Sequence, residues 1–448
     1  MLRYTAILLL AGTVAAQGLE PVGRYDSGVG KGTEIISIQS STRRAVVLVA
    51  NRQIDLLDLS VSATPKRLAR HDLGLADGEE ITSVAFHPKR DLYIAAVRAS
   101  KHDRRGRVVF VTASTGKITG QAEVGFEPDH VAVDPTGRFA VVANEAESYW
   151  KTESGYDSLP GSVSIVSLDG EPSVRDVALP DADGTPGMLT AADGRKIERW
   201  IDGKAVMIPL DSGAPKHLEP EYLVFSPDGK LAYVTLQENN GIAVIDVVGG
   251  KWVRYIGLGK TKHAADFTED GKVAFDAALL ALREPDGIAI TPDGKYLVTA
   301  DEGDTDPKAS KTPRDAATGG GRTITIVDAA TGKVVADTGN QVDLAAHRAG
   351  LYPDKRSDSK GAEPEIVVVF AQGQRVYAAV GLERAKSVVL VDITDARRPT
   401  VLGAFPLGGK SFATEGLAVL QVGGATYIYA ANEMSGDVTV YRFASRSS

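Results

Sequence analysis

Acidic residues recur at two positions of a repeated sequence pattern, and their spacing is suited to binding metal ions. One acid stands at the start of a short apolar segment, and a second follows the end of the next apolar segment. The first set is Glu34, Glu80, Asp129, Glu221, Asp286, Glu365 and Glu415, and the second is Glu145, Glu238, Glu302, Glu383 and Glu433. Carboxylates are preferred ligands of hard cations, and Ca²⁺ takes about six to eight oxygens.

If the repeats bring these carboxylates together, they need counter-charge, because two unit charges about 4 Å apart repel by about 4 kcal/mol at an effective dielectric constant of about 20. We therefore expect a divalent metal, Ca²⁺ in particular. The expected ligands are Glu221, Asp286, Glu302, Glu365, Glu415, Glu145, Glu383 and Glu433. Two other arrangements stay open. Arginines can fork onto the carboxylates, and backbone N–H groups of a neighbouring repeat can bind the acids, which suits Glu34 and Glu80.

Few other residues offer catalytic chemistry. Among the seven histidines, His130 is the one that adjoins an acid of the first set, and packing inside the protein is the competing interpretation. Arg322 and Arg384 lie beside acids and could clamp a phosphate. The chain has no cysteine, which excludes thiolate metal sites and disulfides. No Gly-x-Ser-x-Gly motif supports a serine hydrolase.

The acids sit in a sequence unit that repeats seven times. Clear copies are EPDHVAVDPTGRFAVVANE from Glu127, EPEYLVFSPDGKLAYVTLQE from Glu219 and EPDGIAITPDGKYLVTADE from Glu284. Each copy contains two apolar strands joined by a tight turn, and a second apolar pair follows it. Turns such as SPDG and AATG carry the Pro, Asp and Gly that hairpins require. The pattern predicts an all-β, seven-bladed β-propeller built from four-stranded antiparallel blades.

The two ends of the repeat array predict how the ring closes. The seventh unit stops after three strands, at residues 437–443, and the segment after residue 17 resembles a missing fourth strand. Pairing the two would remove two exposed sheet edges. All long insertions fall in connections that alternating strands place on one face, at residues 146–160, 181–218, 260–283, 303–321 and 341–362. Within them, residues 275–282 predict a short helix.

Composition limits the partners and the location of the protein. Residues 1–16 match a signal peptide, with Arg3, an apolar stretch and a small-residue cleavage site. Residues 17–448 should then form a single propeller that is secreted or periplasmic, without a membrane span and monomeric. The net charge of −8 argues against a nucleic-acid partner.

The repeats resemble the choice-of-anchor I propeller family, which includes mesenchyme-specific cell-surface glycoproteins. The resemblance rests on LEPEYLVFSPDGKLAYVTLQENN from Leu218, REPDGIAITPDGKYLVTADEGD from Arg283, and NEMSGDVTVY from Asn432. It implies a propeller, export and a metal-binding face, and members are often labelled alkaline phosphatase or phytase-like esterase. The family's NEGDAR loop is here DEGDTD, and the missing arginine puts any activity that depends on it in doubt.

Two functions from different classes follow. One is a metal-dependent phosphoesterase, in which a cation polarises a phosphoryl oxygen and Arg322 or Arg384 holds the phosphate of a small-molecule phosphoester. The other is a non-catalytic binding module for an extracellular mineral, glycan or protein on the insertion face. A lactonase-like hydrolase is a third, weaker hypothesis.

Overall fold

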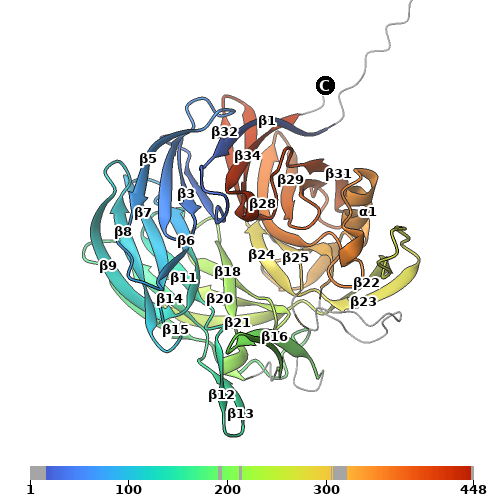
Figure 1. The fold of residues 1–448 in the computed structure, drawn as a ribbon, viewed down its shortest axis with the longest axis horizontal. Helices are drawn as coiled ribbons and strands as arrows, with labels where there is room; N and C mark the ends of the chain where they lie inside the picture. Colours follow the sequence, from blue (N-terminus) through green and yellow to red (C-terminus); the bar gives the residue numbers. More distant parts are fainter. Residues whose placement is uncertain (1–16, 190–193, 211–213, 304, 306–319, 445–448) are drawn as a thin grey trace, which may run out of the picture.

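The computed structural model describes residues 17–189, 194–210, 214–303, 305 and 320–444. In this part of the chain, seven four-stranded antiparallel sheets stand around a common axis (Figure 1). The predicted seven-bladed β-propeller is confirmed. The predicted signal peptide, residues 1–16, lies outside the described residues. No described helix is long and apolar enough to cross a membrane.

Each blade runs from an innermost strand to an outermost one. The strands of blades 1 to 3 are β2 (Ile36–Gln39), β3 (Arg44–Val49), β4 (Gln53–Asp58) and β5 (Lys66–Asp72); β6 (Glu80–Phe86), β7 (Leu92–Arg98), β8 (Arg105–Thr112) and β9 (Lys117–Phe126); and β10 (Pro128–Val133), β11 (Phe139–Asn144), β14 (Ser162–Ser167) and β15 (Ser173–Ala178). Those of blades 4 and 5 are β18 (Pro220–Phe225), β19 (Leu231–Leu236), β20 (Gly241–Asp246) and β21 (Lys251–Gly257); and β24 (Pro285–Ile290), β25 (Tyr296–Asp301), β26 (Thr323–Asp328) and β27 (Val334–Asp337). Those of blades 6 and 7 are β28 (Pro364–Gln372), β29 (Arg375–Leu382), β30 (Ser387–Asp392) and β31 (Thr400–Pro406); and β32 (Thr414–Val422), β33 (Ala425–Asn432), β34 (Asp437–Ala444) and β1 (Gly18–Asp26).

The turns of the inner hairpins form as the sequence predicts. In blade 4 the Ser226 hydroxyl donates to Asp228 Oδ1 at 2.8 Å, and Gly229 follows with a φ of 71°. Glycine enters this left-handed region without the clash that a Cβ would cause. Blade 5 repeats the arrangement, with the Thr291 hydroxyl 2.7 Å from Asp293 Oδ1. These turns are short, so each innermost strand is held directly against its neighbour.

The N-terminal strand closes the ring. β1 pairs antiparallel with β34, from Gly18 opposite Ala444 to Asp26 opposite Asp437, and so completes blade 7. Gly23 lies so close to the next blade that a Cβ there would stand 1.6 Å from the Ala63 carbonyl oxygen. The predicted pairing of the two ends is confirmed, and blade 7 contains strands from both ends of the chain.

The insertions contain more regular structure than the sequence indicates. Three are two-stranded hairpins, β12 (Tyr149–Thr152) with β13 (Gly155–Ser158), β16 (Lys196–Ile201) with β17 (Lys204–Pro209), and β22 (Lys260–Ala265) with β23 (Ala277–Leu282). The remaining elements are α1 (Gln341–Arg348) and the short 3₁₀ helices η2 (Pro215–His217), η3 (Asp354–Arg356) and η4 (Glu433–Ser435). Figure 1 shows β12 and β13 projecting from the ring.

The helix predicted for residues 275–282 is wrong, because residues 277–282 form strand β23. This strand pairs along its whole length with β22, and its Leu279 and Ala281 are buried while Leu280 between them is partly exposed. A short apolar run fits a strand or a helix equally by periodicity, and the partner strand decides between them. The true helix of this face is α1, which packs Val342 and Ala346 against blades 5 and 6.

The closure leads to a first prediction. Leu19 in β1 is 5% exposed and packs with Tyr377 and Phe443, whereas the adjacent Glu20 is exposed. We expect Leu19→Ala to lower the free energy of unfolding by about 2–5 kcal/mol and Glu20→Ala to change it by less than about 0.5 kcal/mol. Urea titration followed by circular dichroism measures both. Equal, small effects of the two substitutions would mean that β1 does not close the ring.

Candidate functional site

The innermost strands bring carboxylates of six blades, and one from a strand end, to one cavity at the mouth of the channel. We call this cavity of about 300 Å³ the acidic chamber. Its acidic lining residues are Glu34, Asp129, Glu221, Asp286, Glu365, Glu415 and Glu433, and its other lining residues include Thr82, His130 and Tyr222. The predicted convergence of the first set of acids is therefore observed at six of its seven positions.

Backbone irregularities aim these side chains at the channel. The register between the two innermost strands shifts just where the acid stands, as at Asp129 in blade 3, between Pro128 and His130. The same shift occurs at Glu221, Asp286, Glu365 and Glu415. A β-bulge places two residues opposite one and turns a side chain out of the regular alternation. The bulge thus explains why these acids leave the sheet faces and line the channel.

Blade 2 departs from the prediction for Glu80. Glu80 pairs in register with Arg98, and their side chains are 3.6 Å apart at their closest charged atoms. The residue in the bulge is Thr82, and its side chain lines the acidic chamber instead. Counting residues from the start of the apolar run missed this offset of two, because the bulge position depends on the partner strand.

A second carboxylate, two residues before the chamber acid, was not singled out from the sequence. Blades 3 to 6 each read Glu-Pro-acid, and the first glutamates are Glu127, Glu219, Glu284 and Glu363. All four are buried. Three of them have left-handed φ values of 43°, 51° and 62°, at Glu127, Glu284 and Glu363. The repeated Glu-Pro pair was the available signal.

These first glutamates hold the insertions. Glu127 accepts the N–H of Ser148 at 2.9 Å, and Glu284 accepts that of Thr305 at 2.9 Å. Arg356 donates to Glu363 at 2.7 Å. Each Glu-Pro-acid motif therefore directs one carboxylate to a partner in an insertion and the other to the acidic chamber.

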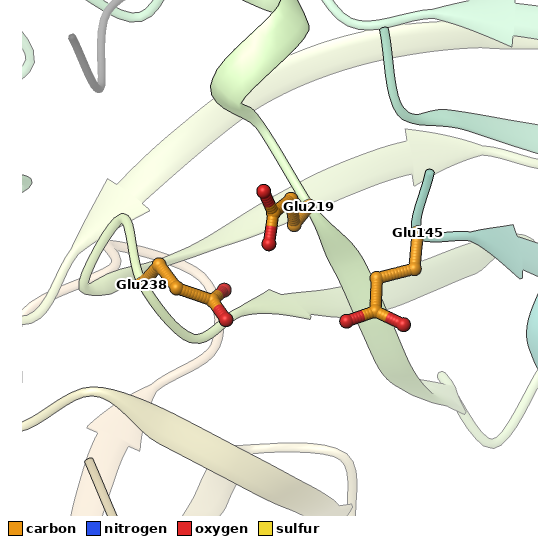
Figure 2. A group of neighbouring side chains, drawn as sticks. All are labelled: Glu145, Glu219 and Glu238. Carbon is orange, nitrogen blue, oxygen red and sulfur yellow. The ribbon is translucent and has the colours of Figure 1, made fainter. Parts of the chain in front are cut away.

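Beside the acidic chamber, Glu145, Glu219 and Glu238 form a cluster with a resident counter-charge. Figure 2 shows their three carboxylates turned toward one another, and one oxygen of each lies within 4.8 Å of the others. Arg199 of β16 donates to Glu238 at 3.0 Å and also to Glu219. Tyr149 donates its hydroxyl to Glu219 at 2.8 Å. Hairpin β16–β17 thus supplies the cation for two of these acids.

Glu302 and Glu383 also lie where the sequence places them, next to the first-set acids. Glu302 forms one compact group with Asp286 and Glu365 and another with Glu363 and Glu383. Lys360 Nζ is 2.7 Å from Glu302, and Gln237 donates to Glu302 at 2.7 Å.

Two carboxylates of the chamber itself have unused oxygens. Glu221 Oε2 and Glu365 Oε2 are buried and have no hydrogen-bond partner among the described residues. No lysine or arginine is among the described residues that line the acidic chamber. Buried polar atoms are normally satisfied, so these oxygens are available to a ligand.

Burial and crowding raise the pKa values of the chamber acids. Burial is the larger cause, and the charges of neighbouring carboxylates add to it. The pKa rises to about 7 for Glu34 and Asp129 and to about 8 for Glu415. The pKa values of Glu221, Asp286 and Glu365 also rise well above the usual range. Because of these raised pKa values, some of the chamber carboxyls stay protonated near neutral pH when no cation is bound.

The two candidate arginines differ in availability. Arg322 is 1% exposed, donates to the carbonyls of Asp266, Ser357 and Ser359, and lies 3.6 Å from Asp343. It packs over Phe267 and stabilises the insertions; its Nε has no hydrogen-bond partner among the described residues, but the side chain is buried and is not presented to a phosphate. The side chain of Arg384 is 38% exposed and is 2.9 Å from Glu383 and 3.5 Å from Glu363.

His130 lies in the wall of the acidic chamber. It is 6% exposed and stacks on Tyr222 with ring centroids 3.7 Å apart. Burial lowers the pKa of His130 to about 3, so its imidazole is neutral. The two rings also line the apolar channel beyond, a cavity of about 460 Å³ that includes Ile35, Val131 and Val224. The stacked pair therefore stands between the two cavities.

Removing the resident cation of the Glu219–Glu238 pair should be costly. Arg199→Gln removes a cation that pairs with two buried carboxylates, Glu219 and Glu238, so we expect a loss of about 3–5 kcal/mol in the free energy of unfolding. Arg138→Gln is the matched control, because Arg138 pairs with Asp169 in solvent, and we expect less than about 1 kcal/mol. Chemical denaturation of both variants measures this. Similar losses would show that Arg199 does not neutralise the cluster.

The raised pKa values predict how stability depends on pH. In the unfolded chain these carboxyls have pKa values of about 4, so the folded protein binds more protons between about pH 5 and 8. Its stability should therefore fall as pH rises through 7 and 8. With EDTA present, we expect Tm to drop by roughly 3–6 °C between about pH 6 and 8.5, and Glu415→Gln should reduce the drop. A Tm that rises over this range would contradict the prediction.

Comparisons with known proteins agree with this architecture. The family model of the choice-of-anchor I domain matches residues 34–319 and 305–396. Among solved structures, Kuenenia stuttgartiensis hydrazine synthase aligns with a TM-score of 0.56 and 15% identity, over 94% of this chain and 98% of that chain, which shows a shared fold alone. A search of curated proteins gives no significant match. The family match covers most of the chain and agrees with the seven blades of the structure, so this protein belongs to the choice-of-anchor I family.

Proposed function

We propose that this protein is an extracellular propeller that binds divalent cations, Ca²⁺ first among them, in its acidic chamber. One observation carries the proposal: seven carboxylates line the chamber, and no lysine or arginine stands among its described lining residues. A hard cation supplies the charge that the lining lacks, and carboxylate oxygens are its preferred ligands.

The residues of the chamber fit such an ion. Asp286 and Glu365 of the chamber each have an oxygen within 4.8 Å of one another and of the adjacent Glu302, which pairs with Lys360. Glu365 and Glu221 each have a buried oxygen with no hydrogen bond to break among the described residues. Glu34, Asp129, Glu415 and Glu433 surround the same space and would complete the oxygen set.

The poor availability of the two candidate arginines favours cation binding over phosphoester hydrolysis as the function. A bound cation would polarise a phosphoryl oxygen and lower the pKa of water. The expected phosphate clamp is weak, however, because Arg322 is buried against carbonyl groups of the insertions and Arg384 is paired with Glu363 and Glu383. The alternative of a metal-dependent phosphoesterase therefore depends on the cations alone to hold the phosphate.

Export is part of the proposal. Choice-of-anchor domains are typically extracellular or at the cell surface. Millimolar extracellular Ca²⁺ would suit a site of modest affinity, since extracellular calcium modules bind at about 10⁻⁴–10⁻³ M. The insertions around the chamber would present the bound ion to an extracellular ligand.

The test is metal analysis of the mature protein, residues 17–448, after desalting at neutral pH, followed by calorimetric titration with Ca²⁺. We expect stoichiometric uptake, and a loss of at least about tenfold in affinity for Glu221→Gln combined with Glu365→Gln, because each removes a charged ligand. Glu171→Gln, at an exposed acid in a turn of blade 3, is the control. Absence of uptake would refute the proposal. Hydrolysis of phosphomonoesters by the Ca²⁺-loaded protein would establish the enzymatic alternative.

A further inference from the structure

We propose that the acidic chamber contains two chemically different cation positions, and that the position at His130 selects a borderline transition ion such as Zn²⁺ over Ca²⁺. This inference rests on the proposed function, because it assigns ions to parts of the same chamber. It concerns the side of the chamber formed by blades 3 and 4.

The two sides of the chamber offer different donors. On the side of blades 5 and 6, Asp286, Glu302 and Glu365 provide oxygens alone, already grouped within 4.8 Å. On the side of blades 3 and 4, the lining residues are Asp129, His130, Glu221 and Tyr222, so an imidazole lines the chamber with two carboxylates, although these three are not among the groups of described residues whose ligand atoms lie within 4.8 Å. The first set suits a hard cation, and the second is a mixed nitrogen and oxygen set.

His130 has the features of an unused ligand. The residue is 6% exposed, lines the chamber, and its Nδ1 is buried without a hydrogen-bond partner among the described residues. An unsatisfied buried polar group costs about 1–3 kcal/mol, so an imidazole without a ligand destabilises the fold relative to an apolar side chain at this position. Stacking on Tyr222 fixes the plane of the ring.

The fold does not require a histidine here. In blade 7 the residue after the bulged acid is Gly416, which holds the same register position as His130. The residues after the chamber acids of blades 1, 5 and 6 are Ile35, Gly287 and Ile366. In blade 4 the position is Tyr222, so the fold accepts several residue types there, and among these blades an imidazole occurs in blade 3 alone.

Two carboxylates line the same side of the chamber as His130. Asp129 is adjacent to it in the bulge, and Glu221 on the next blade has an oxygen with no hydrogen bond to break among the described residues. An ion at His130 would draw these two carboxylates toward it. Imidazole nitrogen favours Zn²⁺, Cu²⁺ and similar ions, whereas sets of oxygens alone favour Ca²⁺ and Mg²⁺.

The experiment uses metal-free mature protein and three ions. Calorimetric titration with Zn²⁺ in saturating Ca²⁺ measures whether a Zn²⁺ position persists beside the Ca²⁺ position. Cu²⁺ at one equivalent serves as a spectroscopic probe, because electron spin echo measurements detect the ¹⁴N of a ligating imidazole. The variant is His130→Phe, which keeps a ring on Tyr222 and removes the nitrogens. The control is His102→Phe, since His102 stacks on Trp150 and is not among the residues that line the chamber.

We expect Zn²⁺ to bind in the presence of Ca²⁺, and His130→Phe to weaken Zn²⁺ at least about tenfold and remove the ¹⁴N signal while Ca²⁺ affinity stays unchanged. Zn²⁺ binding and ¹⁴N signal that survive in His130→Phe would overturn the inference and leave the proposed function intact. A wild-type Cu²⁺ complex without ¹⁴N modulation would overturn it without any variant. Uptake of neither Ca²⁺ nor Zn²⁺ would refute both the inference and the proposed function.

Discussion

Mutual repulsion of carboxylates around one axis is the constraint on which this structure depends. A propeller brings the starts of its innermost strands to the same mouth, so a residue type that recurs there in the repeat is concentrated in one place. Seven acids line a space of about 300 Å³. In water each pair would repel by about 1 kcal/mol at 4 Å, and several times more where the dielectric constant is lower. The fold must resist this repulsion or neutralise it.

The closed ring supplies the resistance. Blade 7 combines β1 from the start of the described chain with β32 to β34 from its end, and β1 packs Leu19 and Tyr25 into the adjacent cores. Blades 7 and 1 also share a cluster in which Val47, Tyr429 and Val438 are fully buried. With no blade free to move outward, the acids stay buried and close together, and burial first, then the neighbouring charges, raise their pKa values.

The sequence predicts the repeats, their number, the closure and the face of the insertions, because each follows from local turn residues and from strand alternation. It fails where the outcome depends on a partner strand. Glu80 and Thr82 exchange roles because a bulge sets which residue faces the channel, and residues 277–282 become a strand because β22 lies beside them. Arg322 stands directly before a strand, but its partners are carbonyls of distant insertions, which no spacing rule indicates.

The two carboxylates of the Glu-Pro-acid motif provide an internal comparison for the function. Where this protein neutralises a buried glutamate for structural reasons, it uses its own groups: Arg199 for Glu219, Arg356 for Glu363, and the N–H of Thr305 for Glu284. Two residues further along the chain, the same motif places Glu221, Asp286 and Glu365 in a chamber without such a partner among its described lining residues. Shared backbone and shared neighbours make the contrast hard to attribute to the fold. No lysine or arginine stands among the described residues that line the chamber, and the proposed cation would supply the positive charge that the buried glutamates of the motif receive from the insertions.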